Sequence, residues 1–200
     1  MKNFAADLLR SVLLTLVLAV VCCALYPLAV YGGARLFFRA QSEGSLIYAP
    51  DGTTVRGSRL LAQNFASERN FAPRPSAAGT GYDATSSGGT NYGPTSAKLA
   101  DDLKGLIAAY RKANGLSDAV PVPADAVTRS GSGLDPHISL ANAALQAPRV
   151  ARARGLPLAT VSAAIAAATA PRDLGVLGDP GVNVLALNVA LDQLTPLKQP

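Results

Sequence analysis

The chain has 200 residues and carries 18 basic and 13 acidic side chains, a net charge of +5. The basic residues are scattered and tryptophan is absent, which argues against a nucleic-acid-binding protein. The two cysteines lie together in an apolar N-terminal stretch, so the rest of the chain contains no disulfide framework. Charged residues make up only 16% of the chain, which favours a surface that largely meets other protein or membrane.

Residues 11–34 form an apolar stretch that predicts a membrane span. The stretch contains no charged residue and is bracketed by Arg10 and Arg35. At 1.5 Å per residue, a helix of this length measures about 36 Å, and the hydrocarbon core of a bilayer is roughly 30 Å thick. We therefore expect a tail over residues 1–10, a transmembrane helix over 11–34 and a connector over 35–43.

Three other interpretations of this stretch are weaker. A cleaved secretory signal has a shorter apolar region, and the nearest small-residue cleavage site, 32–34, follows an overlong run. A buried helix of a globular protein is rarely this long without a polar face. Cys22 and Cys23 follow residues too bulky for a lipoprotein cleavage site, so we interpret them as small apolar membrane residues.

The orientation of the span follows from its flanks. Lys2 and Arg10 on one side nearly balance Arg35 and Arg39 on the other. A short basic tail before a first apolar segment usually stays in the cytoplasm, and long domains translocate regardless of charge. We expect residues 1–10 inside the cell and the large domain outside it.

After the span about 165 residues remain, enough for one domain with a core, which we place at 44–196. Its first part reads as short strands near 46–48 and 53–55 around a Pro-Asp-Gly turn, with a third strand possible over 60–65. Residues 67–94 are rich in Pro, Gly, Ser, Thr and Asn, and such a long loop is usually functional or disordered. Three aromatics favour an ordered loop with anchoring side chains: Phe71, Tyr82 and Tyr92.

Helices dominate the second part. An amphipathic helix begins at Thr95 or Ser96 and ends at Gly115. The other predicted elements are a helix from Ser139 to Ala147 that restarts at Pro148 and stops at Gly155, a helix over 158–169, a strand over 182–187 and a helix over 189–194. This mixture predicts an α+β fold, with one N-terminal transmembrane helix followed by a single extramembrane domain.

The only histidine, His137, raises the possibility of a hydrolase. It would pair with Asp135 and with Ser130 or Ser132. Residues two apart rarely form a triad, and Ser132 lacks the glycines two residues to either side that a nucleophile elbow requires. The better interpretation is a tight turn in which Asp135 accepts backbone N–H bonds and His137 starts the next helix. One histidine without clustered carboxylates also gives little support to a metal site.

Two further patterns could bind anions. The glycine-rich run 86–93 lacks the phosphate-binding P-loop pattern and has no G-x-G-x-x-G spacing, so it predicts a loop rather than a nucleotide site. Arg149, Arg152 and Arg154 are consistent with a solvated helix end near its C-terminus or with contact to an anion or partner.

Several short segments, taken together, resemble one known family. They follow the N-terminal span in this order: Gly44–Ile47, Gln63–Phe65, Arg74–Ala77, Ser87–Asn91, Ser132–Ser139, Pro148–Arg154 and Val182–Asn188. In order and spacing they resemble the KdpC subunit of bacterial Kdp-type potassium-transporting ATPases, from about Phe4 to Leu194. The chain lacks the Asp-Lys-Thr-Gly-Thr phosphorylation motif of the pump subunit.

The resemblance implies a non-catalytic accessory subunit of an inner-membrane potassium-uptake complex. Its implied partners are a potassium-selective channel-like subunit, a P-type ATPase subunit and the lipid bilayer, but no nucleic acid. It also implies a catalytic chaperone that raises the ATP affinity of the pump subunit, with no tightly bound cofactor and with ATP reached through the complex.

The same resemblance implies site residues. Gln146 matches a proposed nucleotide contact, with Arg149 beside it. The expected structural or partner motif comprises Ser132, Gly133, Asp135, His137, Ser87, Gly88, Gly89 and Asn91. Because ATP is cytoplasmic and our topology places Gln146 outside the cell, we expect any effect on ATP use to travel through the membrane subunits. A direct ATP-binding module remains the alternative.

Overall fold

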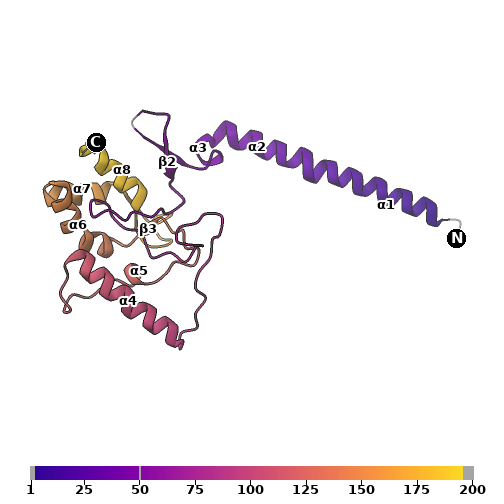
Figure 1. The fold of residues 1–200 in the computed structure, drawn as a ribbon. Coiled ribbons are helices and arrows are strands. Elements are labelled where there is room, and N and C mark those ends of the chain that lie inside the picture. The colour runs from indigo at the N-terminus through magenta and orange to yellow at the C-terminus, as the bar shows by residue number, and fades with distance from the viewer. Residues whose placement is uncertain (1–2, 50, 196–200) are drawn as a thin grey trace. The chain divides into compact units, whose positions relative to one another are not determined.

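The computed structural model describes residues 3–49 and 51–195. The chain divides into two compact units, Met1–Leu46 and Ile47–Pro200, and each is described by itself (Figure 1). Lys2, Pro50 and the predicted domain end at residue 196 lie outside the described residues. The boundaries expected at residues 10, 34 and 43 stay predictions.

The first unit is dominated by one long helix with no buried residue. It comprises α1 (Phe4–Ala19), a π-helical turn η1 (Val20–Leu25) and α2 (Tyr26–Phe37). Over 34 residues it is the one helix in the described part of the chain that is long and apolar enough to cross a membrane. It contains the whole of the predicted span 11–34, and at 1.5 Å per residue it measures about 50 Å.

The π-helical turn has a local cause. Pro27 has no N–H, and its ring crowds the carbonyl of the residue four positions earlier, so the α-helical hydrogen bond between these two residues cannot form. Just before the proline, the N–H of Tyr26 donates to the carbonyl of Val21, five residues back. One widened turn therefore accommodates the proline without ending the helix.

The predicted connector after the span is helical except for one break. Phe38 leaves the helix with φ of −134°, and α3 (Arg39–Ser42) follows as a single turn. Glu43 accepts hydrogen bonds from Arg35 at 2.8 Å and Arg39 at 3.2 Å. The Arg35–Glu43 ion pair bridges the break at Phe38, whereas Arg39 and Glu43 both lie after it.

Two strands open the next segment: the first lies where the sequence predicts it, and the second lies at 55–58 rather than at the predicted 53–55. β1 (Leu46–Tyr48) pairs with β2 (Val55–Ser58). The third strand expected over 60–65 is wrong, because this segment makes isolated contacts instead of a ladder. The N–H of Ala62 donates to the carbonyl of Leu134, and the side chain of Gln63 donates back to the carbonyl of Arg56.

A three-stranded antiparallel sheet lies at the centre of the domain. Its order is β3 (His137–Ile138), β5 (Gly181–Asn183) and β4 (Thr169–Ala170). Ile138 and Thr169 both pair with Val182, from opposite sides. The prediction that His137 starts a helix is wrong, since it occupies the edge strand β3 and the helix begins three residues later.

The helices of the domain are α4 (Ala97–Asn114), α5 (Ala124–Val127), α6 (Leu140–Arg154), α7 (Leu158–Ala167) and α8 (Val184–Leu194). Gly115 and Gly155 end α4 and α6 in the left-handed conformation, at φ of 65° and 67°, as predicted. The predicted restart at Pro148 is wrong, because α6 runs through it. Pro148 and Ala144 are both exposed, so water can solvate the carbonyl that loses its partner.

The predicted strand over 182–187 is also wrong beyond Asn183. The Asn183 side chain accepts a hydrogen bond from the N–H of Ala186 at 3.0 Å and so caps α8. From there Val184, Leu187 and Leu191 recur at helical spacing, and all three are fully buried. The apolar run is consistent with either a strand or a helix until Asn183 is recognised as a helix cap, because short buried strands and buried helix segments have similar compositions.

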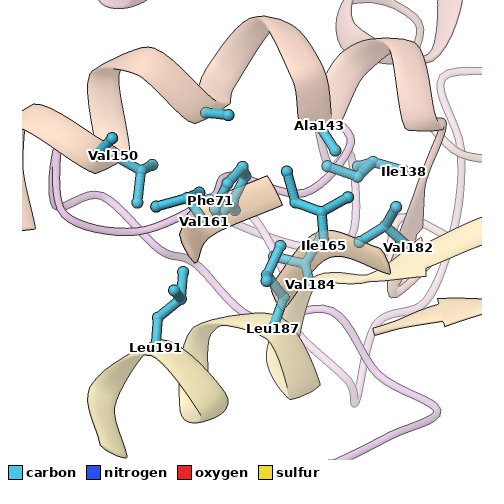
Figure 2. Packing of buried hydrophobic residues seen from close by; sticks show 12 residues of the cluster. Phe71, Ile138, Ala143, Val150, Val161, Ile165, Val182, Val184, Leu187 and Leu191 are labelled. Atoms are coloured by element: carbon cyan, nitrogen blue, oxygen red, sulfur yellow. The ribbon is translucent and has the colours of Figure 1, made fainter. Parts of the chain in front are cut away.

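The core joins α6, α7, α8 and the sheet to one loop residue. Figure 2 shows Phe71 among side chains from the three helices, and it is fully buried. Its cluster comprises Ile138, Ala143, Ala147, Val150, Ala151, Val161, Ile165, Val182, Val184, Leu187 and Leu191. The aromatics Phe71, which is buried, and Tyr82, which is half-buried, anchor the loop 67–94 as predicted, whereas Tyr92 is 41% exposed.

Candidate functional site

A buried amide holds the segment that carries Phe71. Gln146, on α6, is 1% exposed. Its Nε2 donates to the carbonyl of Ala72 at 3.0 Å and to Asn142 Oδ1 at 2.8 Å. Its Oε1 accepts from the N–H of Ala72 at 2.8 Å and from Arg149 at 3.0 Å. Both donors and both acceptor sites of this amide are therefore used within the domain.

A second amide repeats this arrangement one residue earlier. Asn188, on α8, accepts from the N–H of Phe71 at 2.8 Å and donates to its carbonyl at 2.9 Å. Two side chains thus pair with consecutive peptide groups as a neighbouring strand would. They satisfy a buried backbone that has no strand partner of its own. We call Gln146, Asn188 and the backbone of residues 71–72 the amide clasp.

Two arginines extend the clasp toward residues 68–70. Arg149 donates to Asn114 Oδ1 and to the carbonyls of Glu68 and Asn70, and burial lowers the pKa of its guanidinium. The side chain of Arg154 is wholly buried and pairs with Asp192 at 2.9 Å. Arg154 also donates to the carbonyl of Arg69 and to Asn70 Oδ1. These cations therefore bind the domain's own backbone.

The clasp continues into a polar network around Asp125, on α5. This carboxylate accepts from the backbone and hydroxyl of Ser139, both at 2.8 Å, and from Asn142 Nδ2 at 2.9 Å. The hydroxyl of Tyr110, on α4, donates to Asn142 Oδ1 at 2.8 Å. Burial, aided by Asp125, raises the pKa of Tyr110. Ser139 also caps α6, as predicted, by accepting from the N–H of Asn142.

The two glycine-containing motifs of the sequence meet in space. The N–H of Gly88 and the hydroxyl of Ser87 both donate to the carbonyl of Ser132, each at 2.9 Å. Gly133 has φ of +68°, and a Cβ there would lie 2.7 Å from Ala78. Glycine is required at this crossing, because any side chain would meet backbone in a conformation that side chains disfavour.

Two ion pairs fix the loops on either side of this crossing. Arg129 donates to both oxygens of Asp102, at 2.8 and 3.0 Å, and so lowers the pKa of that carboxyl. Arg74 donates to Asp135 at 3.0 Å. Tyr82 donates to the carbonyl of Arg74, and burial raises the pKa of its hydroxyl.

His137 lies beside a pocket of about 350 Å³ that Arg59, Thr169 and Asn183 also line. Its Nδ1 is 3.9 Å from Asp135, beyond hydrogen-bonding distance. Its Nε2 lies 3.5 Å from Asn183 Nδ2.

These residues do not form the catalytic triad that the hydrolase alternative requires. Neither Ser130 nor Ser132 hydrogen-bonds the His137 ring, and the Ser132 hydroxyl instead accepts from the N–H of Leu134. Asp135 accepts from the N–H of His137 at 2.9 Å, which is the turn that the sequence predicts.

The expected site residues thus fall into two groups. Ser87, Gly88, Gly89, Ser132 and Gly133 meet at the loop crossing, while Gln146 and Arg149 belong to the amide clasp. The remaining expected residues lie apart from these contacts: Asn91 is exposed at φ of +51°, and Asp135 and His137 form the turn.

Sequence reasoning missed Asn188 and Asn142, and it considered Arg154 only as a solvated helix end or a contact to an anion or partner, whereas Arg154 is buried against Arg69, Asn70 and Asp192. A lone asparagine inside the apolar run 184–191 is the signal that could have identified Asn188. Among residues 3–49 and 51–195, no group of three His, Cys, Asp or Glu side chains could hold a metal ion.

Comparison with known proteins identifies one family over nearly the whole chain. The family model described as KdpC, the c chain of the K⁺-transporting ATPase, matches residues 8–193. The chain belongs to the KdpC family. The match includes the loop crossing, the amide clasp and the long apolar helix from residue 8 onward.

Individual members of the KdpC family match over nearly their whole length. A potassium-transporting ATPase KdpC subunit of Rhodospirillum rubrum is 55% identical over 86% of this chain and 88% of its own. The KdpC subunit of Mycobacterium tuberculosis strain H37Rv is 49% identical over 94% of this chain and 98% of its own. That of Koribacter versatilis is 45% identical, over 97% and 98%.

Proposed function

We propose that this chain is the accessory subunit of an ATP-driven, high-affinity potassium-uptake complex in the bacterial inner membrane. It is anchored by the Phe4–Phe37 helix and assembles with a potassium-selective channel-like subunit and a P-type ATPase subunit. Its domain contributes assembly and regulation, while the phosphorylation chemistry belongs to the pump subunit.

The observation that carries this proposal is the KdpC family match over residues 8–193, together with relatives named as subunits of potassium-transporting ATPases. The construction of the domain supports an accessory role. The guanidinium and amide groups of its polar network bind the chain's own backbone and carboxylates. These contacts stabilise the folded domain itself.

The decisive experiment is growth on limiting potassium. A strain that lacks this subunit but retains the other components is complemented with the wild-type chain or with a variant lacking residues 3–37. We expect the wild type to restore growth and the variant, which still contains the domain, to fail. Equal growth on abundant potassium is the control. Wild-type complementation of a strain lacking the entire transporter would contradict an accessory role.

A catalytic-chaperone role is the finer part of the proposal. The domain raises the ATP affinity of the pump subunit through contacts passed along the membrane subunits, with no tightly bound cofactor of its own. The occupied amide of Gln146 supports this indirect route, because a nucleotide would have to displace four internal hydrogen bonds.

Direct binding of ATP by Gln146 and Arg149 is the competing route, and photolabelling separates the two. The intact complex is irradiated with azido-ATP, and the labelled subunits are resolved. We expect label on the pump subunit and none on this chain. Label on this chain that disappears in a folded Gln146→Ala variant would establish the direct route.

A further inference from the structure

The connection between β4 and β5, residues 171–180, presents apolar side chains that the domain does not bury. Leu174 is 90% exposed, Val176 73% and Leu177 57%. Exposed apolar residues are ordinary when they occur singly. Three within four positions at the tip of one connection form a patch of the kind that marks a contact surface.

The tip is held in one shape by hydrogen bonds of its own. Asp173 and Leu177 exchange two backbone hydrogen bonds, both at 2.9 Å. The N–H of Gly175 donates to the carbonyl of Arg172, and the Arg172 guanidinium donates to Asp179 at 2.6 Å. The patch is therefore presented preformed, which reduces the ordering entropy that binding would require.

Leu174 is poorly suited to its position in the isolated domain. Its φ of +52° is left-handed, a conformation that favours glycine or asparagine over a branched side chain. Its side chain gains almost nothing from burial within the chain. A leucine at position 174 therefore does not stabilise the isolated domain, whereas its apolar side chain would stabilise contact with a partner.

We infer that residues 173–177 dock into an apolar pocket on another protein subunit of the same transport complex, with a basic side chain at the rim facing Asp173. This inference rests on the proposed function. Asp173 has no ion-pair partner among the residues that the structure describes, so its charge is available to a partner.

A protein partner fits this tip better than a lipid surface does. The segment carries one arginine, already paired to Asp179, and two aspartates, so its net charge is −1. It contains no aromatic residue. Segments that bind anionic bilayers are typically basic and use aromatic side chains at the interface.

The first test separates docking from folding. In Leu174→Asn the left-handed backbone suits the new residue, while the apolar contact is lost. The full-length chain is co-expressed with the other subunits and recovered through a tag on the pump subunit in detergent. We expect at least a tenfold loss of this chain from the complex, with no fall in Tm. Leu60→Asn, at another exposed leucine, is the control and should be retained.

The second test distinguishes protein from lipid by charge reversal. Asp173→Lys should lower retention in the complex and leave binding to vesicles of phosphatidylethanolamine and phosphatidylglycerol unchanged. Stronger vesicle binding with full retention in the complex would overturn the inference in favour of lipid. Recovery of Leu174→Asn at the wild-type level would overturn it outright. If the wild-type chain itself fails to co-purify, the proposed function falls.

Discussion

Gln146 is a buried polar residue whose every hydrogen-bonding group is used by its own domain. It is 1% exposed, and its side chain pairs with both the backbone N–H and the backbone carbonyl of Ala72. Truncating such a residue destabilises the fold, because the backbone N–H and carbonyl that it bonds are left unpaired in a site that excludes water. Its role in the fold can therefore be measured separately from any effect on ATP.

We predict that Gln146→Ala lowers the free energy of unfolding by about 2–4 kcal/mol, since two buried backbone groups lose their partner. Gln193→Ala, at an exposed position of α8, is the matched control and should stay within about 0.5 kcal/mol of the wild type. Urea denaturation of the purified chain in detergent measures both. A stable Gln146→Ala variant would contradict the clasp.

Gly133 and Gly131 offer a second pair of matched variants. An alanine at 133 combines φ of +68° with a Cβ only 2.7 Å from backbone, and we expect a loss of about 2–4 kcal/mol. An alanine at 131 would meet no atom within 4 Å, and we expect a change within about 0.5 kcal/mol. Thermal unfolding measures the stability of both variants. Equal stability would contradict the requirement for glycine at position 133 of the loop crossing.

At the scale of elements, one bidentate ion pair ties α4 to the loop that carries Arg129. Because Arg129 lowers the pKa of Asp102, the pair stabilises the folded chain above the usual carboxyl pKa of about 3.9. That contribution is lost as the pH falls below this value and Asp102 becomes protonated.

We therefore predict that Asp102→Asn reduces Tm near neutral pH and flattens the fall in Tm between about pH 5 and about pH 3. Asp101→Asn is the neighbouring control, because Asp101 is exposed and makes one contact with Lys104 at 3.4 Å. It should preserve the acid-dependent fall. Loss of that fall in both variants, or in neither, would remove Asp102 as its source.

The long helix is the second element with a direct test. Leu18 lies near the centre of Phe4–Phe37, and an arginine there costs about 2.5–3.5 kcal/mol on insertion scales. We expect Leu18→Arg to leave the membrane fraction on carbonate extraction and Leu18→Ile to remain in it. A Leu18→Arg chain that still sediments with a complete complex would rule out an anchoring role.

At the scale of the whole molecule, the sidedness of the domain decides what it can regulate. A domain outside the cell can act on potassium entry directly and on ATP only through membrane subunits. We predict that protease added to intact spheroplasts cleaves within residues 47–195 and spares a tag placed at the N-terminus. Cleavage of the domain only after lysis would place it in the cytoplasm and revive direct contact with ATP.

The sequence by itself determined those features that depend on local chemistry. An uninterrupted apolar stretch identified the helix that is long and apolar enough to span a membrane, glycines placed the ends of α4 and α6, and Ser139 marked the start of α6. The causes of these features lie within a few residues of each of them.

Only the tertiary structure decided the features that depend on distant partners. Asn188 lies in an apolar run, yet its side chain hydrogen-bonds to the backbone N–H and carbonyl of Phe71, 117 residues away in sequence. The apolar run from Val182 changes from strand to helix at Asn183 because that side chain caps α8 and the residues after it fill a helical face of the core. Burial and long-range hydrogen bonds override local secondary-structure preference. An unpaired polar group in the core costs more free energy than the helix or strand propensity of a residue contributes.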